Sequence, residues 1–244
     1  MRKILFTLCA AVALMCMSCK TTAEVNTLQG KKVLLVYGGW DGHQPKECMA
    51  LLKPWLESRG AEVVTSEKLD VYTDKTFMQT VDLTVQCWTM GQISGDQEKG
   101  LIEAVKGGMG LAGWHGGLGD AFRNNTDYQF MVGGQWVAHP GGIVDYDVDI
   151  KDKKDPVTRG LNRFHMKSEQ YYMHVDPSVK VLATTTFSGE EGSPWIKGVV
   201  MPVVWKKSYG SGRVFYSSLC HSASDFEVPE ALEIMKRGIE WAVK

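Results

Sequence analysis

Short apolar runs alternate with amphipathic segments in the first half of the chain. Residues 32–37, 81–88 and 109–114 are continuous apolar runs, the pattern of strands that are buried on both faces of a parallel sheet. Residues 45–59 and 94–107 carry apolar side chains at helical spacing and are followed by glycines. This order indicates right-handed βαβ crossovers, so we predict a three-layer α/β fold with helices flanking a mostly parallel sheet.

The pattern changes beyond residue 140, where polar and apolar residues alternate. Residues 144–150 have apolar side chains at every second position, which predicts a half-exposed edge strand or an antiparallel strand. The remaining apolar segments predict strands at 179–185, 198–205 and 213–219, and an amphipathic helix at 229–243. There is no internal repeat, and the length fits one α/β domain over residues 31–244.

The first residues have the order of an export signal. Two basic residues precede an uncharged apolar stretch, residues 4–17, and Ser18 precedes Cys19. This order predicts a signal peptide over residues 1–19 with Cys19 as the lipidation site, followed by a flexible tether over 20–30. The apolar stretch is shorter than the roughly 20 residues that a spanning helix needs. We therefore expect an exported lipoprotein, periplasmic or on the cell surface, held to the membrane by its lipid only. An ordinary cleaved signal and a short uncleaved anchor are the alternatives.

Charge and cysteine content argue against several classes of protein. The formal net charge is −1, so the chain has no basic excess for binding nucleic acid. The cysteines after the leader, Cys48, Cys87 and Cys220, are odd in number and widely spaced, without a CxxC pair. We expect no disulfide framework, and thiols that pack as small apolar side chains.

Three histidines stand directly after predicted strands. His43 ends the glycine-rich segment 38–43, His115 follows the strand at 109–114, and His221 follows the strand at 213–219. The carboxyl ends of parallel strands form the ligand crevice of an open α/β sheet, so we expect these imidazoles to meet there. The segment at 38–43 lacks the GxGxxG and GK[ST] patterns of phosphate-binding loops.

The segment GWHGG at 113–117 has the layout of a nucleophile elbow, in which a tight turn exposes one side chain above the sheet. Its central residue is His115, which is suited to act as a base, an acid or a metal ligand but not as a covalent nucleophile. At the last strand, Cys220 and His221 must point to opposite faces because they are neighbours. We predict that Cys220 is buried and that His221 lies in the site, whereas His165 and His174 are surface residues.

Two further segments carry polar groups suited to a ligand. His139 precedes Pro140 in a rigid loop that is placed to cover the crevice. Glu169 and Tyr171 belong to SEQYY at 168–172, which combines a carboxylate, an amide and two phenols that can hydrogen-bond a polyol. A solvated edge segment is the alternative interpretation of 168–172.

Four separated motifs together resemble the ThuA-like, or trehalose-utilisation, proteins: GWHGG at 113–117, GGQWVAHP at 133–140, Glu169 near Tyr171, and GRVFY at 212–216 leading to His221. The resemblance covers nearly all of residues 31–244. It implies a flavodoxin-like fold related to the class I glutamine amidotransferases, in which GxCxG would align with 113–117. His115 then replaces the nucleophilic cysteine, so glutamine hydrolysis is not expected. The family's association with catabolism of trehalose-type disaccharides through 3-keto sugars implies a carbohydrate substrate.

These observations favour an enzyme that acts on a disaccharide or 3-keto glycoside by elimination, isomerisation or hydrolysis. A keto group makes the neighbouring C–H acidic, so one base and one acid suffice. We expect His115, Glu169 and His221 to share acid–base catalysis. The residues expected to bind the substrate are His43, Trp114, His139 and Tyr171. Trp40 and Trp136 also offer apolar faces for a sugar ring, although such side chains commonly belong to the core.

Three neutral imidazoles and a carboxylate also form a familiar ligand set for a divalent first-row metal ion. The chain has no compact motif such as HExxH, so the sequence leaves the metal unassigned. Two other functions stay open. One is a carbohydrate-binding lipoprotein without turnover, and the other is a hydrolase that depends on Cys220.

Overall fold

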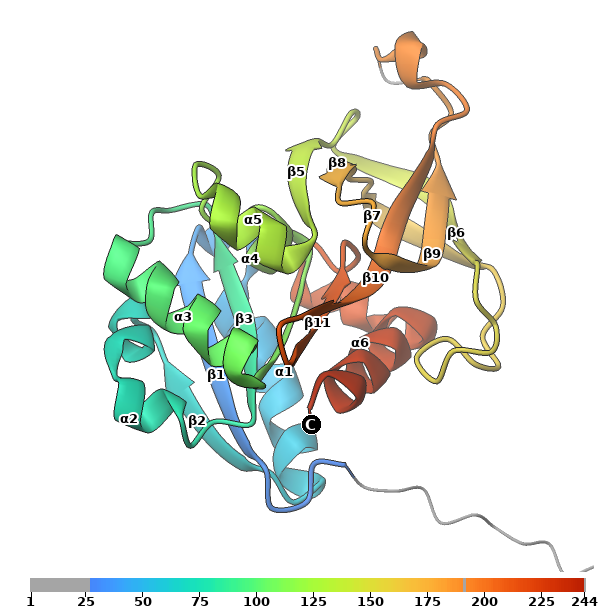
Figure 1. Cartoon of the computed structure of the whole chain (residues 1–244). Coiled ribbons are helices and arrows are strands. Elements are labelled where there is room, and N and C mark those ends of the chain that lie inside the picture. Colours follow the sequence, from blue (N-terminus) through green and yellow to red (C-terminus); the bar gives the residue numbers. More distant parts are fainter. Residues whose placement is uncertain (1–26, 191, 244) are drawn as a thin grey trace, which may run out of the picture.

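A mixed sheet of nine strands forms the centre of the domain (Figure 1). The computed structural model describes residues 27–190 and 192–243. The strand order is β2-β1-β3-β4-β11-β10-β9-β6-β7. The first five strands of this order are parallel to one another, and the last four pair in antiparallel fashion. The helices and strands in chain order are β1 (Lys32–Gly39), α1 (Pro45–Ser58), β2 (Glu62–Ser66), α2 (Lys75–Met78), β3 (Leu83–Thr89), α3 (Gly95–Gly107), β4 (Gly110–Trp114), α4 (His115–Gly119), α5 (Thr126–Val132), β5 (Gly134–Ala138), β6 (Ile143–Ile150), β7 (Phe164–Glu169), β8 (Tyr172–Val175), β9 (Lys180–Thr186), β10 (Val200–Tyr209), β11 (Gly212–Ser217) and α6 (Pro229–Ala242).

Helices cover both faces of the sheet and create two hydrophobic clusters. Leu52 of α1 and Ile239 of α6 belong to the cluster on one face. Leu101 of α3 and Met131 of α5 belong to the cluster on the other face. The three-layer α/β fold predicted from the sequence is therefore confirmed.

The predicted strands and helices are all present, with ends that shift by a few residues. The α3 helix starts as its sequence indicates, because Ser94 and Gln97 form a reciprocal capping box. The antiparallel strand expected near 144–150 is β6. The sequence interpretation missed β7 and the small two-stranded sheet of β5 and β8. Glu169 is the last residue of β7 and is buried, so the solvated-edge interpretation of 168–172 is wrong.

The folded domain begins before Lys31. The Leu28 side chain is fully buried in the core, and the Gly30 N–H donates to the Gly60 carbonyl oxygen at 2.9 Å. The predicted tether over 20–30 is therefore too long at its carboxyl end, because residues 27–30 pack on the domain. The predicted signal peptide and Cys19 lie outside the described residues. Within residues 27–190 and 192–243, no helix has both the length and the apolar character needed to cross a membrane.

Candidate functional site

A tight turn between β4 and α4 places His115 at the carboxyl edge of the sheet. The backbone of His115 has φ 46°, in the left-handed region that a residue with a Cβ rarely adopts. The next two residues, Gly116 and Gly117, must be glycines because there is no room for a Cβ atom at either position. A Cβ on Gly116 would lie 2.3 Å from the His43 ring, and one on Gly117 would lie 2.7 Å from the Cys87 Cα. The strand–turn–helix elbow expected at 113–117 is thus present.

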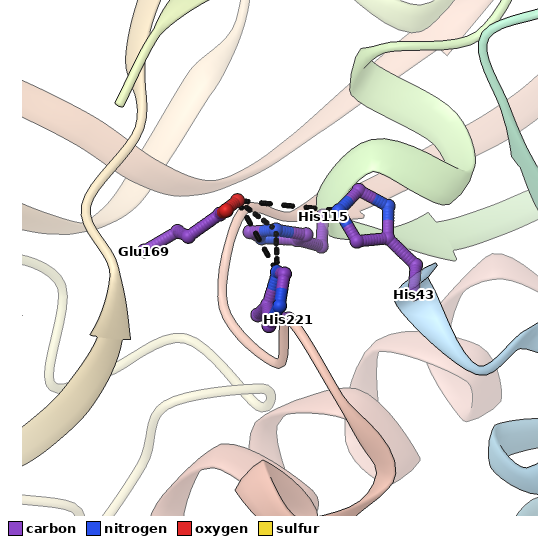
Figure 2. Close-up of side chains that lie close together, drawn as sticks. All are labelled: His43, His115, Glu169 and His221. Atoms are coloured by element: carbon purple, nitrogen blue, oxygen red, sulfur yellow. Dashed lines mark hydrogen bonds and ion pairs between the residues drawn. The ribbon is translucent and has the colours of Figure 1, made fainter. Parts of the chain in front are cut away.

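Three imidazoles converge on the carboxylate of Glu169 (Figure 2). The Glu169 Oε2 atom lies 3.0 Å from His115 Nε2, 3.2 Å from His221 Nδ1 and 3.9 Å from His43 Nε2. The His221 Nδ1 and His115 Nε2 atoms are 3.3 Å apart. The predicted meeting of the strand-end histidines is therefore confirmed. We call His43, His115, Glu169 and His221 the His₃Glu cluster.

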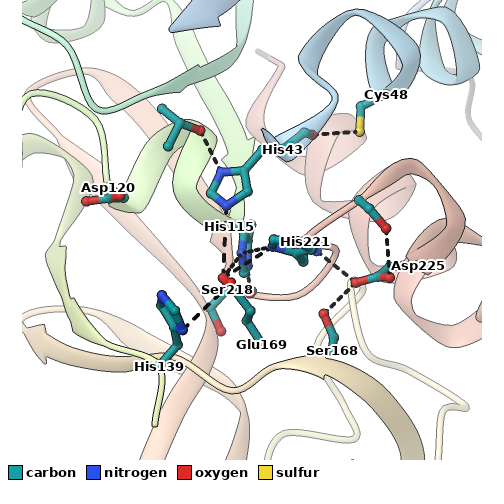
Figure 3. A network of polar contacts seen from close by, with 12 residues as sticks. His43, Cys48, His115, Asp120, His139, Ser168, Glu169, Ser218, His221 and Asp225 are labelled. Carbon is teal, nitrogen blue, oxygen red and sulfur yellow. Dashed lines mark hydrogen bonds and ion pairs between the residues drawn. The ribbon is translucent and has the colours of Figure 1, made fainter. Parts of the chain in front are cut away.

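Each histidine of the cluster is fixed by a second contact (Figure 3). The His115 Nδ1 atom lies 2.8 Å from the backbone oxygen of Ser218, and the His43 Nδ1 atom lies 2.8 Å from Thr89 Oγ1. The backbone N–H of His221 donates to Asp225 Oδ2 at 2.8 Å. These supporting residues were not among the site residues predicted from the sequence.

Only one of these three supporting residues, Thr89, could have been predicted from the sequence. Thr89 ends β3, so the rule that led to His115 also applies to it. Ser218 contributes only its backbone carbonyl, for which side-chain identity gives no signal. Asp225 lies in the short η4 helix (Ala223–Glu227), whose position opposite His221 depends on the tertiary fold.

The hydrogen bond to Ser218 determines how His115 faces Glu169. A backbone carbonyl only accepts, so the His115 Nδ1 atom carries the hydrogen. In the neutral ring, Nε2 then presents its lone pair to the Glu169 carboxylate. A nitrogen lone pair and a carboxylate oxygen repel each other. The His115 Nε2 and Glu169 Oε2 atoms therefore attract each other only when a cation, either a proton or a metal ion, lies between them.

The donor atoms of the cluster have the spacing of a metal site. All four lie within 4.8 Å of one another. Three of the separations are 3.0–3.3 Å. Ligands about 2.1 Å from a tetrahedral ion are expected roughly 3.4 Å apart. The second contact of each metal-ligating histidine normally goes to a carbonyl, carboxylate or water, as His115 shows. The His₃Glu cluster could therefore hold a divalent metal ion.

Burial and mutual contacts shift the pKa values in the cluster. Burial lowers the pKa of His43 to about 3, with His115 and His221 adding to the effect. Burial also lowers the pKa of His115, against the opposing hydrogen bond to Glu169. The hydrogen bond to Glu169 raises the pKa of His221. Burial alone would raise the pKa of Glu169, but the close contacts with the imidazoles of His115 and His221 outweigh it and hold that pKa well below its usual range.

His139 lies at the outer side of the cluster. Its Nδ1 atom is buried, lies 3.7 Å from Glu169 Oε1 and has no hydrogen-bond partner among the described residues. The His139 side chain as a whole is 38% exposed, so the rest of the ring faces the opening. Trp40 is also exposed and packs edge-on against His43. Both rings are open to a ligand.

Two predicted substrate-binding residues are not open to a ligand. Trp114 is 1% exposed and packs against Phe226 in the core, on the face opposite to His115. Its prediction as a ligand contact is wrong, because successive strand residues point to opposite faces. Tyr171 is also buried, and its ring stacks on the His115 ring at 3.9 Å between centroids. Tyr171 therefore orients His115. Trp136 is covered by the Arg123 guanidinium.

The remaining sequence predictions about cysteine and histidine agree with the structure. Cys48, Cys87 and Cys220 are free and buried. Burial raises the pKa of the Cys48 thiol to about 12 and that of Cys220 well above its ordinary value, so neither is a ready nucleophile. His165 and His174 are surface residues, as expected.

Fold and site together define a three-layer α/β protein that carries a buried His₃Glu cluster at the carboxyl edge of its parallel strands. The sequence model of the ThuA family, described as trehalose utilisation, matches residues 32–242. The chain belongs to this family. No curated protein matches the chain by sequence.

Solved structures with similar folds include two ThuA-like proteins. The protein from Bacteroides uniformis is 15% identical, with a TM-score of 0.74 over 87% of this chain and 91% of its own. The protein from Parabacteroides merdae is 20% identical, with a TM-score of 0.70 over 88% and 90%. A β-galactosidase from Bacillus circulans sp. alkalophilus is 13% identical, with a TM-score of 0.52 over 88% of this chain and 31% of its own. At these identities the likeness shows the fold alone.

The burial of His43 predicts an unusual titration. In chelator-treated protein, the His43 ring should stay neutral from pH 8 to pH 5, because its pKa is about 3. The unfolded chain gains this proton near pH 6.5, so His43 should lower stability progressively as the pH falls from about 6.5 towards 3. Imidazole NMR spectra, assigned with a His43→Gln variant, check this. A His43 midpoint near 6.5 would contradict the prediction.

Proposed function

We propose that this protein is a carbohydrate-processing enzyme that acts on a disaccharide or 3-keto glycoside by His/Glu acid–base chemistry. The observation that carries the proposal is the convergence of three imidazoles, from three separate strand ends, on one buried carboxylate. Such clusters are costly to bury and are concentrated at functional sites. Membership of the trehalose-utilisation family supports a carbohydrate as the substrate.

Exposure divides the site into inner and outer groups. The His43 and His115 side chains are 5% and 1% exposed, too little to touch a substrate. His115, expected from the sequence to exchange protons with the substrate, is therefore assigned to holding the cluster together. Glu169, His221 and His139 keep larger exposed fractions, 11%, 19% and 38%.

A divalent first-row metal ion fits the inner position. The residues that would hold it are His43, His115, His221 and the Oε2 atom of Glu169. When bound, such an ion would polarise a substrate carbonyl oxygen and favour loss of the neighbouring C–H proton. The Oε1 atom of Glu169 then remains directed at His139.

His139 is the proton-transfer residue in this arrangement. Its Nδ1 side faces the Glu169 carboxylate, which orients the ring. The exposed side of the ring is free to take a proton from the carbon beside a keto group and to return it to a leaving oxygen. The sequence analysis assigned His139 to substrate binding only.

The two alternative functions have less support. A protein that only binds sugars needs amides and aromatic faces, but not a carboxylate coupled to four imidazoles. A Cys220-dependent hydrolase needs an accessible thiolate, whereas Cys220 is 2% exposed with a raised thiol pKa.

We further propose that the protein is exported and anchored through a lipid on Cys19, because its first residues have the order of a lipoprotein signal. Cells fed a labelled fatty acid should incorporate the label into the wild-type protein and not into a Cys19→Ser variant. Equal labelling of both would contradict this proposal.

The division of roles predicts different effects on turnover. With the 3-keto derivative of trehalose as substrate, His139→Gln should lower kcat by roughly 10²-fold or more, because a proton-transfer group is lost. Glu169→Gln should lose at least as much activity. His174→Ala, an exposed histidine on β8, is the matched control and should leave turnover unchanged. Unchanged turnover in Glu169→Gln would refute the catalytic proposal.

The same variants should differ in metal content. Elemental analysis of wild-type protein should find about one divalent ion per chain, and His139→Gln should retain it. His221→Ala and His43→Ala should lose most of it, since removing one ligand of a four-ligand site weakens binding strongly. His174→Ala serves again as the control. Full turnover of chelated, metal-free protein would overturn the metal assignment.

A further inference from the structure

A polar cleft of about 650 Å³ lies along β6, whose partner strand β7 ends at Glu169. Its lining includes residues of β6 and residues at the beginning and end of the segment between β9 and β10. This segment forms an arm that projects from the domain (Figure 1). Pro140, Gly141, Arg163 and Gln170 also line the cleft. This volume is typical of pockets that take a small organic molecule.

The strand register connects this cleft to the functional site. On β6, Ile143 pairs with Glu169 of β7, and Asp147 pairs with His165. His165 contacts both Asp145 and Asp147, so these side chains share one face of the sheet. Glu169 lies four residues after His165 on the same strand and therefore belongs to the same face. The Asp145 and Asp147 side chains of β6 thus lie on the same face of the sheet as the Glu169 carboxylate.

The chain also connects the cleft directly to His139 and Glu169. Pro140 and Gly141 line the cleft and directly follow His139. Gln170 lines it and directly follows Glu169. The residues that directly follow His139 and Glu169 along the chain therefore border the cleft.

Gln170 contributes a side-chain amide to the lining of the cleft. The residue is 6% exposed, and its Nε2 donates to Thr185 Oγ1 at 2.8 Å and to the Thr186 oxygen at 3.4 Å. Its Oε1 has no hydrogen-bond partner among residues 27–190 and 192–243, although the side chain borders the cleft. An amide oxygen accepts hydrogen bonds, so this atom can accept one from a hydroxyl group of a ligand.

The charges around the cleft select against anions. The carboxylates of Asp145, Asp147, Asp149 and Glu190 line it, against the single guanidinium of Arg163. Arg163 is itself paired with Asp147 and Asp149. Carboxylates, an amide and a guanidinium all hydrogen-bond hydroxyl groups. An added phosphate or carboxylate group would instead meet like charge, which disfavours the wrong ligand.

We propose that this cleft binds the remote sugar unit of an uncharged disaccharide or longer saccharide whose reacting unit lies at Glu169 and His139. The proposal rests on the proposed function for the reacting unit, and it adds that the substrate has at least two sugar units and no phosphate. Ile143 of β6, which lines the cleft and is 50% exposed, provides apolar surface for a sugar ring.

Calorimetric binding to the purified protein tests this proposal independently of turnover. The three probes are glucose, trehalose and trehalose 6-phosphate. Trehalose should bind roughly tenfold or more tighter than glucose, because only the disaccharide reaches the cleft, and the phosphate should weaken binding by a similar factor. In the double variant Asp145→Asn, Asp147→Asn, trehalose 6-phosphate should bind only about threefold more weakly than trehalose, or less. The matched control Asp127→Asn, on the exposed start of α5, should behave as wild type.

Three results would each overturn the cleft proposal. Glucose and trehalose could bind equally, neither could bind, or the double variant could leave the effect of the phosphate unchanged. If Glu169→Gln still abolishes turnover in any of these cases, the proposed function stands without it. Preferential trehalose binding with the expected phosphate effect, but no turnover of the 3-keto derivative, would support the cleft and refute the enzyme.

Discussion

The structure of the site depends on one interaction, the sharing of the Glu169 carboxylate by three imidazoles. A carboxylate in this position loses hydration, and the loss is tolerable only when positive charge or hydrogen-bond donors replace the water. His115 and His221 lie within hydrogen-bond distance of its Oε2 atom. The carbonyl of Ser218 takes the only hydrogen of the neutral His115 ring, so the cluster requires an additional cation. That requirement makes the site a place for proton transfer or metal binding.

The mixed sheet explains how such distant residues meet. β4 and β11 are parallel neighbours, so His115 and His221 leave the sheet at the same edge. β1 ends at this edge as well and brings His43. Glu169 arrives from the other half, at the end of β7 in the antiparallel extension. The parallel half thus supplies the imidazoles, and the antiparallel half supplies the carboxylate together with the polar face of β6.

Strand-end position was the sequence feature with the greatest predictive value. It located His43, His115 and His221 correctly, because parallel strands share a carboxyl edge whatever their length. The same two-residue alternation that predicted a buried Cys220 also excludes Trp114, and applying it there would have avoided the error. Contacts through a backbone atom, such as that of Ser218, have no signal in residue type. The burial of Leu28 was equally invisible, since a lone leucine in a polar segment predicts nothing about packing.

The central claim is that a cation lies between Glu169 and the histidines. A crystal structure of the protein with anomalous diffraction data collected above and below the absorption edges of the first-row metals tests it most directly. The account predicts one anomalous peak about 2.0–2.2 Å from the donor atoms of His43, His115, Glu169 and His221. A crystal with no peak, in which the Glu169 carboxylate has turned away from His115, would contradict it.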